Sequence, residues 1–317
     1  MSSSTVEISL IVPINNEESN ILGLSERIHN VFVTLRVSYE LIYVNDGSTD
    51  ASLAIIQSLS ENNDCIKYID FSRNFGHQIA ISAGLEHAIG TRIIIMDGDG
   101  QDPPERIPDL YKKSLEGYEV VYAKRLKRKG ENWLKKITAS LFYRIMGNIT
   151  TIDIPIDTGD FRLIHQKVQR ILLKMPEQHK YLRGQIAWIG FKSSFIEYDR
   201  EERMGGNTKF TYSKMIRFAT DGISSFSNWP LRMATLLGFL VSGIAFMLIL
   251  YSLYQKFFGY TEAGWTSLHI SVLFLGGVQL LGIGILGEYL GRVSENVKNR
   301  PTYIVRDSNI DGLKEKK

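Results

Sequence analysis

Cysteine is almost absent from this chain of 317 residues, in which Cys65 is the only one. A single cysteine excludes an internal disulfide and a metal site made of cysteine ligands. A large excess of charge of either sign is also missing, since the formal net charge is +3. Proteins that bind nucleic acid usually carry a strongly basic surface, so we do not expect nucleic acid as a partner.

The N-terminus lacks the basic stretch followed by an apolar stretch that marks a secretory signal. Long apolar runs are missing up to about Pro230, and that part of the chain has the mixed composition of a soluble protein. Two such runs follow, Met233–Leu253 without any charge and Leu268–Leu286 with few polar residues. We therefore expect a soluble part that stays in the cytoplasm, followed by an apolar part.

Each apolar run has roughly 20 residues, and a helix of that length spans about 30 Å, the thickness of the hydrocarbon core of a bilayer. Arg232 precedes the first run, Arg292 and Lys298 follow the second, and only Lys256 lies in the loop between them. Because positive side chains stay on the cytoplasmic side, we expect a two-helix transmembrane hairpin with both termini in the cytoplasm. The alternative for each run is a buried helix of a soluble protein. The charged end of the chain, Asp307–Lys317, is expected to be mobile.

The first part of the chain alternates apolar β-type segments with helix-type segments. The strands are too uniformly apolar to have one exposed face, so they indicate an open, mostly parallel α/β sheet with helices on both faces. In such sheets, ligands bind beyond the carboxyl ends of the strands. We expect strands at 8–14, 39–44, 66–71, 92–96 and 119–123, and helices at 17–35, 51–60 and 79–88.

Two further helix-type segments, Glu131–Gly147 and Thr211–Phe226, have apolar residues on one side and basic residues elsewhere. They fit two interpretations. Either these helices cover the core of a soluble domain, or they lie in the membrane interface with their basic side toward lipid headgroups.

An Asp-Gly-Asp motif directly follows the expected strand Arg92–Met96. Asp97 and Asp99 can point into one crevice there, and carboxylate oxygens are suitable ligands for Mg²⁺ or Mn²⁺. Gly98 between them allows a ligand to approach the backbone closely. The alternative is an acidic turn that caps the helix after Pro104.

Polar clusters follow three other expected strands, at Pro13–Asn20, Asn45–Asp50 and Ser72–His77. Each cluster contains residues that are typical of tight turns and helix caps, so each has a purely structural interpretation. Because the carboxyl ends of neighbouring parallel strands meet at one edge of a sheet, the clusters together predict a nucleotide pocket.

These motifs resemble those of the inverting family 2 glycosyltransferases, which use nucleotide-sugars and have the GT-A fold. Within that family the chain resembles the polyprenyl-phosphate branch, namely the dolichol-phosphate mannose synthases and, more closely, the bacterial bactoprenol glucosyltransferases. The resemblance covers nearly the whole chain. It implies a nucleotide-sugar-binding GT-A core (1–130), an acceptor-side region with interface helices (131–230), the transmembrane hairpin (231–292) and a cytoplasmic tail (293–317).

The resemblance also implies roles for single residues. Asp97 and Asp99 would bind Mg²⁺ or Mn²⁺ together with the diphosphate. Asp157 and Asp160 match an acceptor-side motif and would, with Asp99, form the catalytic set, one of them orienting the acceptor or taking a residual proton. The nucleotide-sugar would contact Pro13, Asn16, Glu17, Asp46, Arg73, Gln78, Asp97, Gly98 and Gln101. The acceptor phosphate would be bound by Arg200, Arg203 and Lys209, for which a solvated basic face is the alternative.

The chain departs from the family pattern at three positions. Asn45 stands where a first Asp is common, Gly100 where Leu is usual, and His77 where Lys is frequent. Both expected metal ligands remain, so we interpret the departures as tuning of an active site. Asn45 cannot serve as an acid. His77 fits either a packing role or a place near the diphosphate.

The reaction implied by the resemblance is an inverting transfer of a sugar to undecaprenyl or another polyprenyl phosphate at a bacterial-type inner membrane. UDP-glucose is the first choice of donor, followed by GDP-mannose and UDP-GlcNAc. Two spans without charged residues argue against a channel, so a separate flippase would move the product. Gly287 and Gly291 have the spacing of small residues at packed helices, and packed hairpins would suit a homo-oligomer. The alternatives are a processive polysaccharide synthase and a non-catalytic nucleotide-sugar-binding scaffold.

Overall fold

The computed structural model describes residues 6–126, 158–178, 180–199, 229–258 and 265–313. By contacts the chain divides into two units. The first contains residues 1–147, 152–211 and 301–317, and the second contains residues 148–151 and 212–300. The expected interface segments Glu131–Gly147 and Thr211–Phe226 lie outside the described residues.

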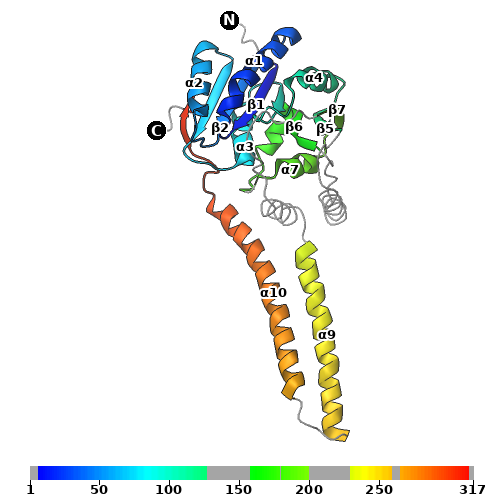
Figure 1. The fold of residues 1–317 in the computed structure, drawn as a ribbon. Helices are drawn as coiled ribbons and strands as arrows, with labels where there is room; N and C mark the ends of the chain where they lie inside the picture. Colours follow the sequence, from blue (N-terminus) through cyan, green and yellow to red (C-terminus); the bar gives the residue numbers. More distant parts are fainter. Residues whose placement is uncertain (1–5, 127–157, 179, 200–228, 259–264, 314–317) are drawn as a thin grey trace. The chain divides into compact units, whose positions relative to one another are not determined.

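The first unit is built on an eight-stranded sheet with the strand order β7-β5-β6-β4-β1-β2-β3-β8 in the described residues (Figure 1). Its centre is the parallel group β3-β2-β1-β4, as the sequence predicted, whereas β6 and β8 are antiparallel to their neighbours β4 and β3. The five expected strands are all present, with small differences at their ends. The strands are β1 (Ile8–Ile14), β2 (Tyr39–Asn45), β3 (Ile66–Phe71), β4 (Arg92–Ile95), β5 (Val120–Arg125), β6 (Thr158–His165), β7 (Ser193–Tyr198) and β8 (Val305–Ser308).

Helices cover both faces of this sheet, and the alternation of side chains along β1 explains why. Leu10 and Val12 belong to one apolar core with residues of α1, while Ile11 belongs to the other core with residues of α3. A strand that is buried on both faces must be apolar throughout, and all of β1 is buried. The helices of this unit are α1 (Glu18–Leu35), α2 (Ser52–Asn62), α3 (His77–His87), α4 (Ile107–Leu115), α6 (Gln166–Leu172) and α7 (Leu182–Ile189), with a 3₁₀ turn at Pro104–Arg106.

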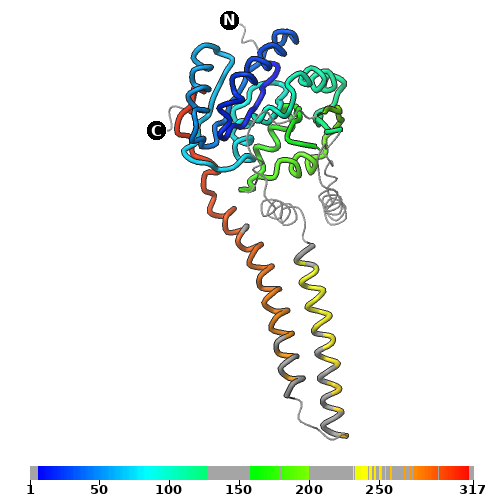
Figure 2. The backbone as a smooth tube through the Cα atoms, viewed as in Figure 1, coloured from blue at the N-terminus to red at the C-terminus, as the bar shows by residue number. Residues whose placement is uncertain are grey.

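Residues 305–313 are ordered, and the expectation of a mobile tail is wrong for residues 307–313. Val305–Ser308 forms β8, antiparallel to β3. The hydroxyl of Tyr68 donates a hydrogen bond to Asp307, and the amide of Asn309 donates one to the carbonyl of Ile66. Asp307, one of the charged residues that suggested mobility, is therefore a partner of the sheet. Figure 2 follows the chain from α10 back to the sheet.

The second unit contains two long helices, α9 (Trp229–Phe258) and α10 (Trp265–Lys298), which contact each other. In the described part of the chain, one stretch is long and apolar enough to cross a membrane, Phe274–Lys298 in α10. The expected pair of helices is present, and the composition of a membrane span is found for one of them.

Candidate active site

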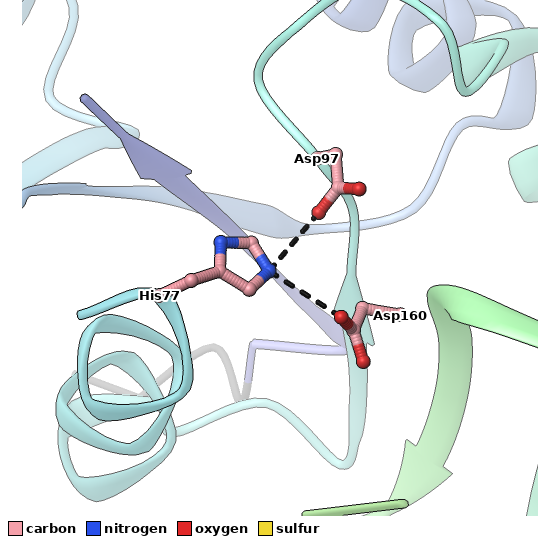
Figure 3. Close-up of side chains that lie close together, drawn as sticks. All are labelled: His77, Asp97 and Asp160. Atoms are coloured by element: carbon pink, nitrogen blue, oxygen red, sulfur yellow. Dashed lines mark ion pairs between the residues drawn. The ribbon is translucent and has the colours of Figure 1, made fainter. Parts of the chain in front are cut away.

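Three polar side chains from different elements converge beyond the carboxyl end of β4 (Figure 3). Asp97 follows β4, Asp160 lies near the start of the antiparallel neighbour β6, and His77 is the first residue of α3. The His77 Nε2 atom lies 3.3 Å from Asp97 Oδ1 and 3.4 Å from Asp160 Oδ2. An antiparallel partner begins where a strand ends, and this brings two carboxylates that are far apart in sequence to one place.

Asp160 accepts several charge-assisted hydrogen bonds. Arg183 donates from Nε and Nη2, each at 3.1 Å, and Arg162 donates from Nη2 at 2.7 Å. Gln78 Nε2 also donates, at 3.3 Å. Burial raises the pKa of Asp160, but Arg183, His77 and Arg162 outweigh burial and hold it well below its usual value. Asp160 therefore stays ionised at neutral pH and is better suited to orienting other groups than to taking a proton.

The same contacts determine the charges of His77 and Asp97. Burial lowers the pKa of His77, but the hydrogen bonds and charges of Asp160 and Asp97 outweigh it and raise the pKa to about 10. Burial raises the pKa of Asp97, and His77 reverses this and lowers it. The His77 ring is 44% exposed, so the cluster is open to solvent on one side.

These three side chains fit a divalent cation that displaces the proton from His77, because only a neutral imidazole binds a metal. Their ligand atoms all lie within 4.8 Å of one another. Metal–ligand bonds of about 2.0–2.2 Å place neighbouring ligand atoms roughly 3–3.5 Å apart, which is close to the two distances at His77. Asp99 is not a member of this group, and its Oδ1 accepts a hydrogen bond from the backbone of Gln101 at 3.1 Å. The structure thus groups Asp97 with His77 and Asp160.

Asp46, expected to contact the nucleotide-sugar, holds a loop in place. Its carboxylate accepts the backbone N–H groups of Phe75 at 2.6 Å and of Gly76 at 3.0 Å. Both residues belong to the Ser72–Gly76 loop after β3, and Arg73 of this loop stacks on the ring of Phe75. Burial raises the pKa of Asp46, and the two N–H groups act in the opposite direction.

The clusters after β1, β2 and β4 lie side by side, as the sequence predicted. Asn16 has a positive φ of 56°, and its Oδ1 accepts the backbone N–H of Thr49 at 2.8 Å. The backbone N–H of Glu17 donates to Ser52 Oγ at 3.0 Å. A Cβ atom on Gly98 would lie 3.0 Å from the carbonyl oxygen of Pro13, so the backbone after β4 passes close to the β1 motif.

Four expected site residues lie outside the described residues: Asp157, Arg200, Arg203 and Lys209. Their roles stay predictions. Sequence reasoning missed Arg183, because no local motif connects an arginine in α7 with an aspartate 23 residues earlier. Arg162 lies in the same motif as Asp160, but no role of its own was expected for it. A signal was available for His77, since it replaces the lysine that is frequent in the family.

Asp102, also part of the segment after β4, is buried and accepts a hydrogen bond from the hydroxyl of Tyr198 at 2.6 Å. Arg125 donates to the same hydroxyl at 3.2 Å. These contacts tie the Asp-Gly-Asp segment to the ends of β5 and β7, which gives Asp102 a structural role.

The chain is similar to known glycosyltransferases. Residues 9–172 match the family described as "Glycosyl transferase family 2". The prophage SfII-derived bactoprenol glucosyl transferase of Shigella flexneri is 40% identical over 304 residues, which cover 96% of this chain and 98% of that protein. An uncharacterised glycosyltransferase of Bacillus subtilis (strain 168) is 46% identical over 304 residues, which cover 96% of this chain and 94% of that protein.

A solved structure of glucosyl-3-phosphoglycerate synthase from Mycobacterium tuberculosis, in complex with Mn²⁺, UDP-Glc and phosphoglyceric acid, has a TM-score of 0.48. It is 17% identical and covers 69% of this chain and 78% of that chain.

An open α/β sheet whose polar motifs meet at one edge, together with these matches, defines the class of this protein as a glycosyltransferase. The chain belongs to glycosyl transferase family 2. The resemblance that its motifs indicated is confirmed.

Proposed function

We propose that this protein transfers a sugar, with inversion, from a nucleotide-sugar to a polyprenyl phosphate at the cytoplasmic face of a membrane. The observation that carries the proposal is the 40% identity to bactoprenol glucosyl transferases over 95–96% of this chain. This similarity favours glucose from UDP-glucose as the transferred sugar and undecaprenyl phosphate as the acceptor. GDP-mannose and UDP-GlcNAc are the alternative donors.

A divalent cation, Mg²⁺ or Mn²⁺, would be held by Asp97 and its neighbours. The described candidates are His77, Asp97 and Asp160, and the Asp-x-Asp pattern adds Asp99. When bound, such an ion neutralises the charge that develops on a departing nucleoside diphosphate. Gln78, which donates to Asp160, and Gln101 would complete the surroundings of the diphosphate.

The acceptor phosphate has to be oriented in the site, but it hardly needs to be deprotonated. A phosphate oxygen is largely ionised at neutral pH, so a strong general base is less necessary than it is for a sugar hydroxyl. An ionised Asp160, fixed by Arg162 and Arg183, suits an orienting role. Asp157 would assist, and Arg200, Arg203 and Lys209 would bind the acceptor phosphate.

The path of the chain supports the transmembrane hairpin. β7 and β8 belong to one sheet, and α9 and α10 lie between them in sequence. A chain that leaves the sheet domain and returns to it crosses a membrane an even number of times. If α10 spans the membrane, α9 is the described helix that can provide the second crossing. Large apolar side chains, among them Phe239, Met247 and Leu280, are exposed on these helices, as a lipid-facing surface requires.

The hairpin would keep the site beside a lipid-bound acceptor in an inner membrane of bacterial type. A homo-oligomer and a separate flippase stay predictions from the sequence.

The proposal is tested by incubating membranes that contain the protein with radiolabelled UDP-glucose, Mg²⁺ or Mn²⁺, and undecaprenyl phosphate. We expect label in the extracted lipid that disappears with EDTA and falls at least about 100-fold in Asp97→Asn, because charge stabilisation in an active site is worth several kcal/mol. The matched control is Asp109→Asn, an exposed residue of α4 paired with Arg106.

Parallel reactions with GDP-mannose and UDP-GlcNAc identify the donor. Label in lipid from one of these donors alone would replace glucose in the proposal and leave the reaction class intact. Nucleotide binding without lipid-linked label from any donor would overturn the proposal in favour of a binding scaffold.

A further inference from the structure

Residues 301–313 follow α10 in the chain and cover the outer side of β3 (Figures 1 and 2). Without β8, β3 would be the edge strand of the sheet. Exposed edges favour association between chains, so protection of an edge is one explanation for this segment. The side-chain contacts indicate a second purpose, because they lead from this edge to the loop Ser72–Gly76.

The segment holds the beginning of that loop directly. The backbone N–H of Ser72 donates a hydrogen bond to the carbonyl oxygen of Ile304 at 3.0 Å. The ring of Tyr303 stacks on Phe71, the last residue of β3, with ring centroids 5.0 Å apart. The Tyr303 hydroxyl donates to Glu86 in α3 at 2.6 Å. Tyr303 therefore connects the strand before the loop with the helix after it.

A chain of hydrogen bonds leads from the segment to the other end of the loop. Arg306 donates to Asp70 from Nε at 2.7 Å and from Nη2 at 3.2 Å. The Asp70 side chain is 1% exposed, and its Oδ1 also accepts the amide of Asn45 at 2.7 Å. Asn45 directly precedes Asp46, whose carboxylate holds the N–H groups at the end of the loop.

This chain of contacts also explains Asn45. An aspartate there would put a second carboxylate 2.7 Å from that of Asp70 in a buried position, where like charges repel strongly. An amide instead donates a hydrogen bond to Asp70. Asn45, Asp70 and Arg306 thus form one hydrogen-bonded group, and the C-terminal segment supplies Arg306.

We propose that residues 301–313 are a positioning segment for nucleotide binding, with Ile304 and Arg306 as the positioning residues. Ile304 holds the start of the loop Ser72–Gly76, and Arg306 acts on its end through Asp70, Asn45 and Asp46. The inference rests on the proposed function, in which this loop contacts the nucleotide of the donor. By this inference, residues 301–313 increase the affinity of the protein for the nucleotide-sugar.

The test compares the affinity of the full-length protein in detergent for UDP, in the presence of Mn²⁺, by titration calorimetry well below the unfolding temperature. We expect Arg306→Ala to weaken UDP binding about tenfold, because a buried carboxylate loses a charged hydrogen-bond donor next to the loop. Arg306→Lys keeps the charge without the paired donors and should fall between Ala and wild type. The matched control, Arg170→Ala, removes an exposed arginine of α6 and should leave the affinity unchanged.

Each outcome decides the inference. If the Arg306 variants unfold at lower temperature but bind UDP as tightly as wild type, the segment only protects the edge and the inference is overturned. If Arg306→Ala does not fold, Arg306→Lys carries the test, and an unchanged affinity there overturns it equally. A wild-type protein that binds neither UDP nor GDP would instead overturn the proposed function and this inference with it.

Discussion

Asp160 accepts hydrogen bonds from Arg162, Arg183 and Gln78 and lies 3.4 Å from the ring of His77. These donors around one buried carboxylate determine its pKa, which the residue type alone would not predict. Two guanidinium groups keep this carboxylate ionised, so it carries a fixed negative charge at neutral pH. At the residue scale, the charge of Asp160 therefore depends on Arg162, which lies in the same motif, and on Arg183, which no sequence motif indicated.

The contribution of Arg183 can be measured through pH. Because the pKa of Asp160 is held below its ordinary value of about 3.9, first of all by Arg183, the ionised carboxylate stabilises the fold above that pH, and this stabilisation is lost as the pH falls through the lowered pKa. Arg183→Gln should reduce stability by about 1–3 kcal/mol at pH 7, and the difference should shrink below about pH 4. Thermal unfolding of both proteins from pH 3 to pH 8 measures this. Arg170→Gln is the control, and an equal difference at all pH values would contradict the argument.

His77 permits a prediction about the metal. An imidazole nitrogen is a better ligand for Mn²⁺ than for Mg²⁺, which prefers oxygen. We expect the wild-type protein to bind Mn²⁺ more tightly than Mg²⁺, and His77→Lys to lose at least about tenfold of that preference. Competition between the two ions, followed by the electron spin resonance of free Mn²⁺, measures it without turnover. His29→Asn, at an exposed histidine of α1, is the control, and an unchanged preference in His77→Lys would exclude His77 as a ligand.

At the element scale, the position of α3 sets the position of His77. α3 packs on β1 at Gly84, where a Cβ atom would lie 2.4 Å from Cγ2 of Ile11. The helix can therefore approach the sheet closely only because this residue has no side chain. His77 begins the same helix, so a shift of α3 changes the distance between His77 and the two carboxylates.

Gly84→Ala should destabilise the protein by about 1–3 kcal/mol, since an extra methyl group overfills a packed interface. Gly23→Ala is a matched control, because nothing lies within 4 Å of a Cβ atom there, and alanine favours a helix by up to about 1 kcal/mol over glycine. Thermal unfolding should therefore show opposite signs for the two variants. A stable Gly84→Ala protein would show that α3 can move away from β1 without cost.

At the scale of the whole molecule, the return of the chain to the sheet after α10 places the sheet domain and the C-terminus on the same side of any membrane that the helices cross. A fluorescent protein fused after Lys317, which fluoresces in the cytoplasm, should therefore be bright, and alkaline phosphatase at the same place should be inactive. Fusions after Phe258, the last residue of α9, should show the opposite pattern. Cytoplasmic signals from both positions would contradict the hairpin.

The sequence by itself determined the central parallel strands and the helices between them, because strands buried on both faces must be apolar throughout and therefore differ visibly from amphipathic helices. It also indicated which strand ends carry the candidate site, since Asp46 directly follows β2 and Asp97 lies two residues after the end of β4. These are local properties, which can be recognised in a short window of residues.

Only the tertiary structure decided which side chains meet. Asp97 is grouped with His77 and Asp160, Arg183 is paired with Asp160, and β8 completes the sheet beside β3. The charge of Asp307 favours a mobile tail when it is considered alone, yet the hydroxyl of Tyr68 binds it. Contacts between residues more than 200 positions apart leave no periodic pattern in the sequence, because they arise only when separate elements have already packed together.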